Sequence, residues 1–230
     1  MEIGTVDGRS GGFLKVSGGQ VKTCPADFHI NGEQSTDGDD LEFPVILKPQ
    51  FQDASIGIDQ ESVIDQPHRL AAALQHLYRR YGPILVEEYI DGREFNISVI
   101  GNASPQTLPV AEIDFSGMPG SLHKIVGYNA KWEPDSIEYR ETKRVFPTLD
   151  NELNTRLSDI ALSCYRLFGL RDYGRIDLRM DRNGRPFVLE INANPCLSPD
   201  AGFAAAYGAA GHDYTAMVAQ MTTFLGDRVV

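Results

Sequence analysis

The pattern of apolar and polar residues is sharpest after residue 42, where it predicts strands and helices in alternation. Apolar runs of strand length occur three times before residue 101, at 43–49, 84–90 and 94–100. Apolar residues at helical spacing over 67–81 predict an amphipathic helix, with Pro67 in its first turn. Asp91-Gly92 is a turn signal between the second and third strands, and it predicts a hairpin there.

The second half of the chain carries one long helical pattern and the clearest hairpin signal. Asp150 suits the N-cap of the helix and Gly169 its C-terminal stop. The residues expected on its buried stripe are Leu153, Leu157, Ile160, Cys164 and Leu167. Alternating residues over 173–180 and 187–192 flank Asn183-Gly184, the strongest short hairpin signal in the chain.

Three segments give weaker signals. Residues 1–40 are rich in glycine and show little periodicity, so we expect loop or weak strand there. Residues 102–148 show no strong period and are interpreted as loop-rich, whereas the Ala-rich tail over 201–225 is interpreted as mostly helical. Mixed strands and helices with two hairpins favour an α+β fold with mainly antiparallel sheets over a doubly wound parallel one.

The second hairpin brings charged residues together. If its turn has two residues, Asp177 faces Glu190 and Arg175 faces Asn192, and all four lie on one face. Directly opposed carboxylates repel, and a hard divalent cation such as Mg²⁺ would compensate for that repulsion. The alternative interpretation is an exposed ladder of ion pairs among Arg175, Asp177, Arg179 and Glu190.

Composition narrows the class of protein. With 21 Lys and Arg against 32 Asp and Glu, the formal net charge is −11, and no basic stripe offers a nucleic-acid site. No apolar run reaches the roughly 20 residues of a membrane helix, and the first residues lack a secretory pattern. Three scattered cysteines fit a reducing compartment. We expect a soluble, cytoplasmic protein that binds neither membranes nor nucleic acid.

Six collinear segments together resemble the ATP-grasp superfamily, most closely the D-alanine–D-alanine ligases. They are Phe43-Pro-Val-Ile-Leu-Lys-Pro49, Ser55-Ile-Gly57, Val86-Glu-Glu-Tyr-Ile-Asp-Gly-Arg-Glu94, Tyr128-Asn-Ala-Lys-Trp132, Gly174-Arg-Ile-Asp177 and Leu189-Glu-Ile-Asn-Ala-Asn-Pro195. The resemblance covers residues 43 to about 225. It implies an ATP-grasp fold, with mainly antiparallel sheets flanked by helices and two subdomains that sandwich ATP.

The resemblance implies a set of ATP contacts. Lys48 would contact the nucleotide phosphates, and Ser55 in the following small-residue loop would donate to a phosphate oxygen as a catalytic residue. Glu87 and Ile90 would contact adenine through their main chain, and Glu94 would accept hydrogen bonds from the ribose hydroxyls.

The resemblance also implies a metal site and catalytic residues. Asp177, Glu190 and Asn192 match the family's ligands for Mg²⁺ (or Mn²⁺), which agrees with the face derived from the hairpin. Arg175 matches the arginine that stabilises the transferred phosphoryl group or the tetrahedral intermediate. Lys131, in a mobile loop, would contact the γ-phosphate and the substrate.

The implied reaction is an ATP-dependent ligation of a carboxylate to an amine through an acyl phosphate. The implied domains are an atypical N-terminal segment (1–42), a small ATP-grasp subdomain (43–101) and a C-terminal ATP-grasp subdomain (102–230). The family normally has a further N-terminal domain. The partner hypotheses are therefore a homodimer or a partner chain that supplies this domain. The expected substrates are a small-molecule carboxylate and a small-molecule amine.

Several positions depart from the family's pattern, and they lie where the second substrate would bind. Ala54 stands where a serine is usual, Trp132 where a tyrosine is usual, Cys196 in place of a glycine, and Ala201 in place of a serine. These changes favour a different amino acid or a peptide as substrate. Two alternatives stay open: a nucleotide-binding fragment that needs a partner or a missing domain for turnover, and a structural α+β domain with a charged hairpin.

Overall fold

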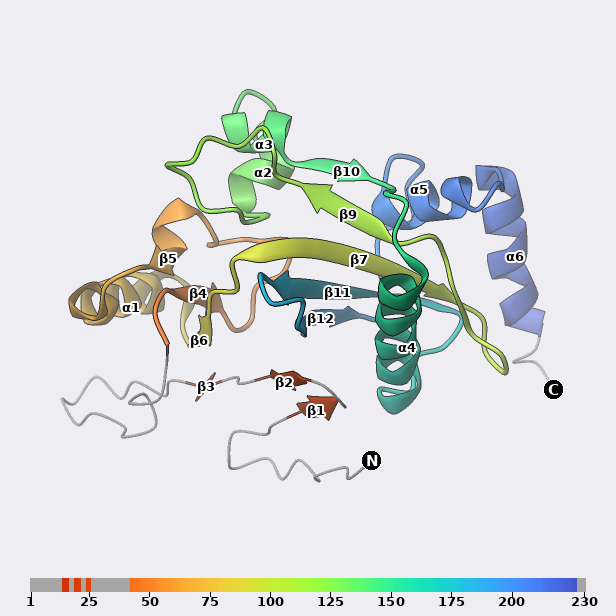
Figure 1. Cartoon of the computed structure of the whole chain (residues 1–230), viewed down its shortest axis with the longest axis horizontal. Helices are drawn as coiled ribbons and strands as arrows, with labels where there is room; N and C mark the ends of the chain where they lie inside the picture. The colour runs from red at the N-terminus through yellow and green to blue at the C-terminus, as the bar shows by residue number, and fades with distance from the viewer. Residues whose placement is uncertain (1–13, 17–18, 22–23, 26–41, 227–230) are drawn as a thin grey trace. The chain divides into compact units, whose positions relative to one another are not determined.

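The structure, a computed structural model, describes residues 14–16, 19–21, 24–25 and 42–226 (Figure 1). Most of the prediction for residues 1–40 therefore lies outside the described residues. The parts that are described form three short strands, β1 (Leu14–Val16), β2 (Gly19–Val21) and β3 (Cys24–Pro25). Among the described helices, none combines the length and the apolar composition that crossing a membrane requires.

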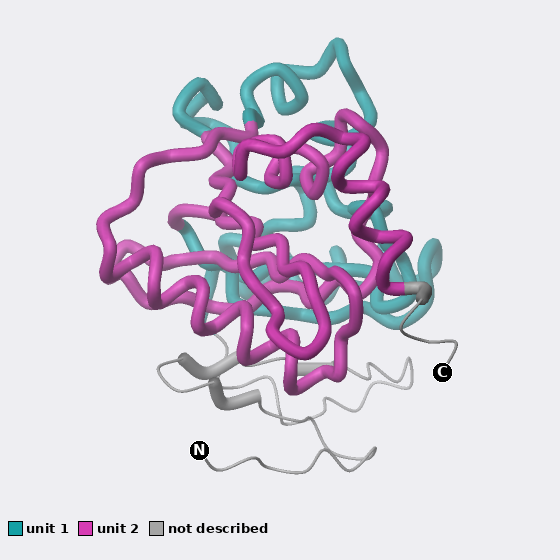
Figure 2. The backbone as a smooth tube through the Cα atoms, turned by 90° about the vertical axis from the view of Figure 1, so that its right-hand side faces the viewer, with its two compact units in different colours: residues 1–91, 115–143 teal, residues 92–114, 144–230 magenta. Residues whose placement is uncertain are grey.

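The chain divides into two compact units, each built from two segments (Figure 2). Unit 1 comprises residues 1–91 and 115–143, and unit 2 comprises residues 92–114 and 144–230. The division predicted at residue 101 concerns subdomains of the ATP-grasp fold and stays a prediction.

Unit 1 is built on an antiparallel sheet in the order β3-β6-β4-β5. Its later strands are β4 (Val45–Pro49), β5 (Val63–Ile64) and β6 (Ile84–Glu88). Helix α1 (Pro67–Tyr81) has the bounds predicted from its periodicity and packs against β4, β5 and β6. The buried core of this layer consists of Val45, Leu47, Ile64, Leu74, Ile84 and Val86.

The segment interpreted as loop-rich also contains short elements of regular structure, which the sequence did not predict. Its elements are β8 (Gln106–Thr107), β9 (Ala111–Asp114), α2 (Tyr128–Trp132), α3 (Ile137–Glu141) and β10 (Lys143–Val145). None exceeds five residues, which is too short to show a helical or strand period. The short helix η2 (Gln60–Ser62) precedes β5 in unit 1.

Unit 2 is built on a larger antiparallel sheet in the order β10-β9-β7-β11-β12, with β8 beside β7. Its long strands are β7 (Gly92–Ile100), β11 (Tyr173–Asp181) and β12 (Pro186–Asn192). One face packs on helix α4 (Asn151–Leu167). The contact is close at Gly174, where an added Cβ would lie 3.3 Å from the Tyr165 ring. The fully buried side chains of this face include Phe95, Ile97, Val99, Ile176 and Leu178.

The ends of α4 agree with the predictions, but its buried stripe differs in part. The Asp150 carboxylate caps the helix by accepting from the Leu153 amide at 2.8 Å. Leu157 and Cys164 are buried as predicted, whereas Leu167 is 48% exposed. Ala161 and Tyr165 are buried in addition, because the covered face turns along a helix of 3.6 residues per turn.

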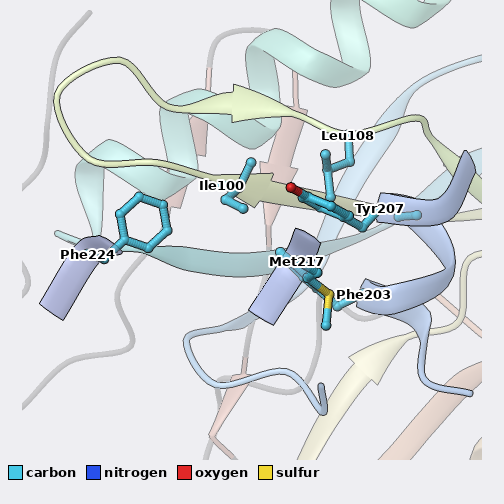
Figure 3. Close-up of a cluster of buried hydrophobic side chains, with 7 residues drawn as sticks. Ile100, Leu108, Phe203, Tyr207, Met217 and Phe224 are labelled. Atoms are coloured by element: carbon cyan, nitrogen blue, oxygen red, sulfur yellow. The ribbon is translucent and has the colours of Figure 1, made fainter. Parts of the chain in front are cut away.

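Helices α5 (Gly202–Ala209) and α6 (Tyr214–Gly226) cover one end of the other face of this sheet (Figure 3). Their cluster includes Phe203, Tyr207 and Met217 with Ile100 from β7. The predicted interruption of the tail is confirmed, since the helices end and begin around Gly211, whose φ is +90°. The rest of this sheet face carries polar side chains on β7 and β11, together with apolar residues such as Phe187 on β12 and Ile113 on β9.

The hairpin predicted at Asp91-Gly92 does not form, because β6 and β7 belong to different sheets. Gly92 instead begins β7 opposite Asp181 on β11. A Cβ on Gly92 would lie 1.8 Å from the Met180 carbonyl oxygen. The glycine is therefore required by a close approach of two backbones rather than by a two-residue turn.

Candidate nucleotide and metal site

Polar residues on three neighbouring strands of unit 2 form one continuous surface, here called the charged face. It consists of Glu94, Asn96 and Ser98 on β7, Arg175, Asp177 and Arg179 on β11, and Glu190 and Asn192 on β12. Backbone pairing arranges them in rows across the sheet: Ser98–Arg175–Asn192, Asn96–Asp177–Glu190, and Glu94–Arg179. The row with two carboxylates lies between two rows that each contain an arginine.

The middle row holds the two carboxylates predicted to bind metal. Asp177 and Glu190 are direct partners across β11 and β12, which places their Cβ atoms about 5 Å apart. Asp177 is 8% exposed, and Glu190 is exposed. Asn192 lies one row away on the same face, and its side-chain oxygen accepts from the Asn194 amide at 2.9 Å.

Arg175 binds both oxygens of Asp177. Its Nε and Nη2 donate to Oδ1 and Oδ2 at 2.7 and 2.8 Å. Burial, the largest influence, lowers the pKa of the guanidinium. Its hydrogen bonds to Asp177 and the charges of Asp177, Glu190 and Glu94 outweigh burial, and they raise the pKa above the usual value. Arg175 is therefore a fixed cation that offsets the acidic row.

A second arginine, Arg179, pairs with Glu94 across β7 and β11. Its Nη1 donates to Oε2 of Glu94 at 2.5 Å, and the two side chains are only 4% and 11% exposed. The structure brings Arg175, Asp177, Glu190 and Asn192 onto one face of unit 2, as the sequence predicts, and the pairing of β7 with β11 adds Glu94 to the same face.

The predicted facing of these residues is confirmed, although the two-residue turn behind the prediction is wrong. The Asp181 amide donates to the Arg185 carbonyl, which closes a three-residue loop with Gly184 at φ +77°. The pairing then shifts between Asp177 and Leu178, where β12 contributes one extra residue, Leu189. This bulge compensates for the longer turn, so Glu190 still faces Asp177.

The donor set of the charged face fits a hard cation. Carboxylate and amide oxygens are the ligands that Mg²⁺ prefers, and Mg²⁺ is often held by one or two carboxylates together with substrate phosphates. Across the described residues, no cluster contains three or more His, Cys, Asp or Glu side chains placed to hold a metal. The pair of carboxylates therefore suits a cation that is completed by a phosphate ligand better than one held in an all-protein cage.

In unit 1, Lys48 and Glu87 form an ion pair. They extend from β4 and β6 on the sheet face opposite α1, and Lys48 Nζ lies 2.5 Å from Glu87 Oε2. Both side chains are about one-fifth exposed, at 22% and 18%. Ile90, predicted to lie in the strand, falls just after the end of β6, where the Tyr89 amide donates to the Pro44 carbonyl.

The small-residue loop of unit 1 is held against the segment that leads into α2. Ser55 Oγ donates to the Val126 carbonyl at 2.7 Å, and Trp132 Nε1 donates to the Ala54 carbonyl at 3.0 Å. Ala54, Ser55 and Gly57 all have positive φ. Lys131 lies on α2 with an exposed side chain, and both the loop and the lysine belong to unit 1, although the predicted division at residue 101 would separate them.

Residues 27–223 match the protein family described as D-ala D-ala ligase C-terminus. The chain belongs to this family. A D-alanine–D-alanine ligase from Desulfotalea psychrophila is 30% identical over 182 residues, which cover 78% of this chain and 53% of that protein. The uncharacterized protein y4sG of Sinorhizobium fredii is 36% identical over 189 residues, covering 81% of this chain and 53% of y4sG. The chain thus spans about half the length of these relatives.

Solved structures of the family show the same fold. A D-alanine–D-alanine ligase from Bacillus anthracis, crystallised with ATP, matches with a TM-score of 0.67 at 21% identity. The match covers 90% of this chain and 60% of that one. The predicted α+β ATP-grasp fold, with antiparallel sheets flanked by helices, is therefore confirmed.

Of the positions that depart from the family's pattern, Ala54 and Trp132 lie in unit 1, and Cys196 and Ala201 lie in unit 2. Cys196 is exposed, and its contact with the Ser198 hydroxyl, Sγ to Oγ 3.1 Å, lowers the pKa of the thiol. Ala201, the N-cap of α5, makes no side-chain capping bond. Arg144 reaches the Asp200 carbonyl at 3.5 Å, and burial followed by the charge of Arg175 lowers its pKa.

Three residues of the charged face were not singled out as site residues by the sequence. Asn96 and Ser98 stand beside Asp177 and Arg175 on β7, and Arg179 binds Glu94. The alternation of β7 contained the signal, because the polar residues Glu94, Asn96 and Ser98 alternate with apolar ones. Only the pairing of β7 with β11 shows that these residues share the face.

Proposed function

We propose that this chain is the nucleotide-binding part of an ATP-dependent ligase that joins a carboxylate to an amine. The observation that carries the proposal is the middle row of the charged face, where Asp177 and Glu190 stand opposite each other with Arg175 alongside. Membership of the D-alanine–D-alanine ligase C-terminal family supports it. ATP and Mg²⁺ or Mn²⁺ are the implied ligands.

The residues have distinct roles in this proposal. Asp177, Glu190 and Asn192 would hold the cation, which when bound neutralises phosphate charge and polarises the phosphoryl oxygens. Arg175 would bind the transferred phosphoryl group or the oxyanion of the tetrahedral intermediate. In unit 1, Lys48 and Lys131 would bind phosphate oxygens and Ser55 would donate to one. Glu87 and Ile90 would offer main-chain groups to adenine, and Glu94 of unit 2 would accept from the ribose hydroxyls.

The proposed chemistry has two steps and needs no protein nucleophile. A substrate carboxylate oxygen attacks the γ-phosphorus, the bond to the β-phosphate oxygen breaks, and ADP leaves. The amine nitrogen of the second substrate then attacks the acyl phosphate, the C–N bond forms, and phosphate departs while the amine loses a proton. The chain contributes position and charge stabilisation.

Two alternatives have specific support. Cys196, whose pKa is influenced by the charge of Arg175, and Ala201, the N-cap of α5, stand at positions that depart from the family's pattern, which favours a different amino acid or a peptide as substrate. The second alternative is a nucleotide-binding unit that needs a further domain or a partner chain for turnover, since the matched relatives are about twice as long as the matched region.

A substrate panel tests the proposal. Phosphate release is measured with Mg-ATP and D- and L-amino acids, singly and in pairs, and amide products are identified by mass spectrometry. We expect a product whose formation falls by about 100-fold or more in Arg175→Met. The matched control is Arg93→Met, which breaks the partly exposed ion pair with Glu112 on the other face of β7. Mg-ATP binding without any amide product would favour the fragment alternative.

A further inference from the structure

The pair of Arg179 and Glu94 lies on the charged face but takes no part in the proposed chemistry. The two residues are direct partners across β7 and β11, and both are buried. Arg179 comes two residues after Asp177 on the same strand, so its row is about 7 Å from the carboxylate row. This distance is one that the sugar of a nucleotide with its phosphates at Asp177 would span.

Stability alone is a poor reason for this pair. Removing two charges from water is costly, and replacing a buried ion pair by apolar residues of similar size is often neutral or stabilising. The pair also stands directly next to the row of Asn96 and Asp177 on the charged face. A charge pair at this position can hold the carboxylate of Glu94 in a fixed direction.

We infer that Arg179 is a positioning residue that holds the Glu94 carboxylate toward the ribose hydroxyls, so that the chain distinguishes ribonucleotides from deoxyribonucleotides. The inference rests on the proposed function, because it takes Glu94 as the acceptor for ribose. Arg179 presents a planar guanidinium that binds one oxygen of Glu94, Oε2, and thereby restricts rotation of the carboxylate. An oriented carboxylate accepts a hydroxyl hydrogen bond without first losing side-chain freedom.

Binding calorimetry with three nucleotides tests this role. We expect wild type to bind Mg-ATP about 10-fold more tightly than Mg-2′-deoxy-ATP or Mg-3′-deoxy-ATP, as the loss of a hydrogen bond to a charged group implies. Arg179→Met should bind all three with similar affinity, close to that of wild type for the deoxy nucleotides. Arg179→Lys should restore part of the preference, which a purely structural role would not produce.

Two variants keep the test conclusive. Arg93→Met removes the partly exposed partner of Glu112 from the same strand and should keep the full preference. If Arg179→Met does not fold, the double variant Glu94→Gln, Arg179→Met removes both charges together and should fold without the preference.

The outcomes separate this inference from the proposed function. Wild type that binds Mg-ATP with no ribose preference, or Arg179→Met that keeps it, overturns the role of Arg179 and leaves the proposed function intact. Wild type that binds no Mg-nucleotide overturns both.

Discussion

Both oxygens of Asp177 accept hydrogen bonds from Arg175, and the same carboxylate is the proposed ligand of a divalent cation. A metal ion must therefore share Asp177 with the guanidinium or displace it. A nucleotide phosphate would favour displacement, since it offers Arg175 another bidentate anion. The arrangement links metal binding to nucleotide binding through one arginine.

Metal affinity without nucleotide tests this competition. Arg175→Met removes the competing cation and leaves Asp177 and Glu190 opposed without compensation. We expect Mn²⁺ to bind this variant more tightly than wild type, on the order of 10-fold, when titrated in the absence of ATP and followed by electron paramagnetic resonance. An unchanged affinity in Arg175→Met would show that Arg175 and the metal do not compete. Arg93→Met serves as the charge-matched control.

The two cysteines with described side chains should differ in reactivity. Burial raises the pKa of Cys164 to about 11, whereas the Ser198 contact lowers the pKa of the exposed Cys196. A lower pKa means more thiolate at neutral pH, and thiolate is the reactive form. Peptide mass spectrometry after iodoacetamide treatment should therefore show modification at Cys196 first, with an onset at lower pH than that of a free thiol.

Cys164 should react only when the protein unfolds. Its side chain, on α4, is fully buried. Adding denaturant should therefore expose the thiol, whereas raising the pH of the folded protein should not. Equal rates at Cys164 and Cys196 in the folded protein would contradict this account.

At the scale of elements, local pattern predicted the long segments and missed the short ones. The bounds of α1 and the cap of α4 follow from periodicity, Pro67 and Asp150. The short elements between residues 102 and 148 depend on tertiary pairing, such as that of β9 with β7, and leave no period in the sequence.

The composition of turns predicted the structure less well than the periodicity of long segments did. Asp91-Gly92 has the composition of a hairpin turn, yet Gly92 begins a strand of another sheet. At the second hairpin, the longer turn and the bulge at Leu189 compensate each other, so Asp177 still faces Glu190 as predicted. The sequence pattern indicated neither the longer turn nor the bulge.

Gly92→Ala tests the close approach at the start of β7. The added Cβ would lie 1.8 Å from the Met180 carbonyl oxygen, so β7 and β11 must separate at the end that holds Glu94 and Arg179. We expect the free energy of unfolding to fall by about 2–4 kcal/mol, measured by urea unfolding and circular dichroism. Gly120→Ala, where a Cβ meets nothing within 4 Å, should change it little. Similar midpoints for the two variants would refute the close approach.

For the whole molecule, the family and fold follow from collinear segments spread over most of the chain, and the comparisons confirm both. Sequence reasoning identified the carboxylates and Arg175, because their spacing is local to one hairpin. It did not identify Arg179, whose partner Glu94 lies 85 residues away along the chain. Substrates are harder to predict, because the chain covers only about half of each relative.

The most direct test of the account is thermal stability with and without Mg-ATP, for wild type and for the double variant Asp177→Ala, Glu190→Ala. Each protein is compared with itself, so any change in intrinsic stability from removing the two charges cancels. At a hundred times its dissociation constant, Mg-ATP should stabilise wild type by about 2.7 kcal/mol and should leave the double variant unchanged. No shift in wild type, or an equal shift in both proteins, would contradict the assignment of the charged face as the Mg-ATP site.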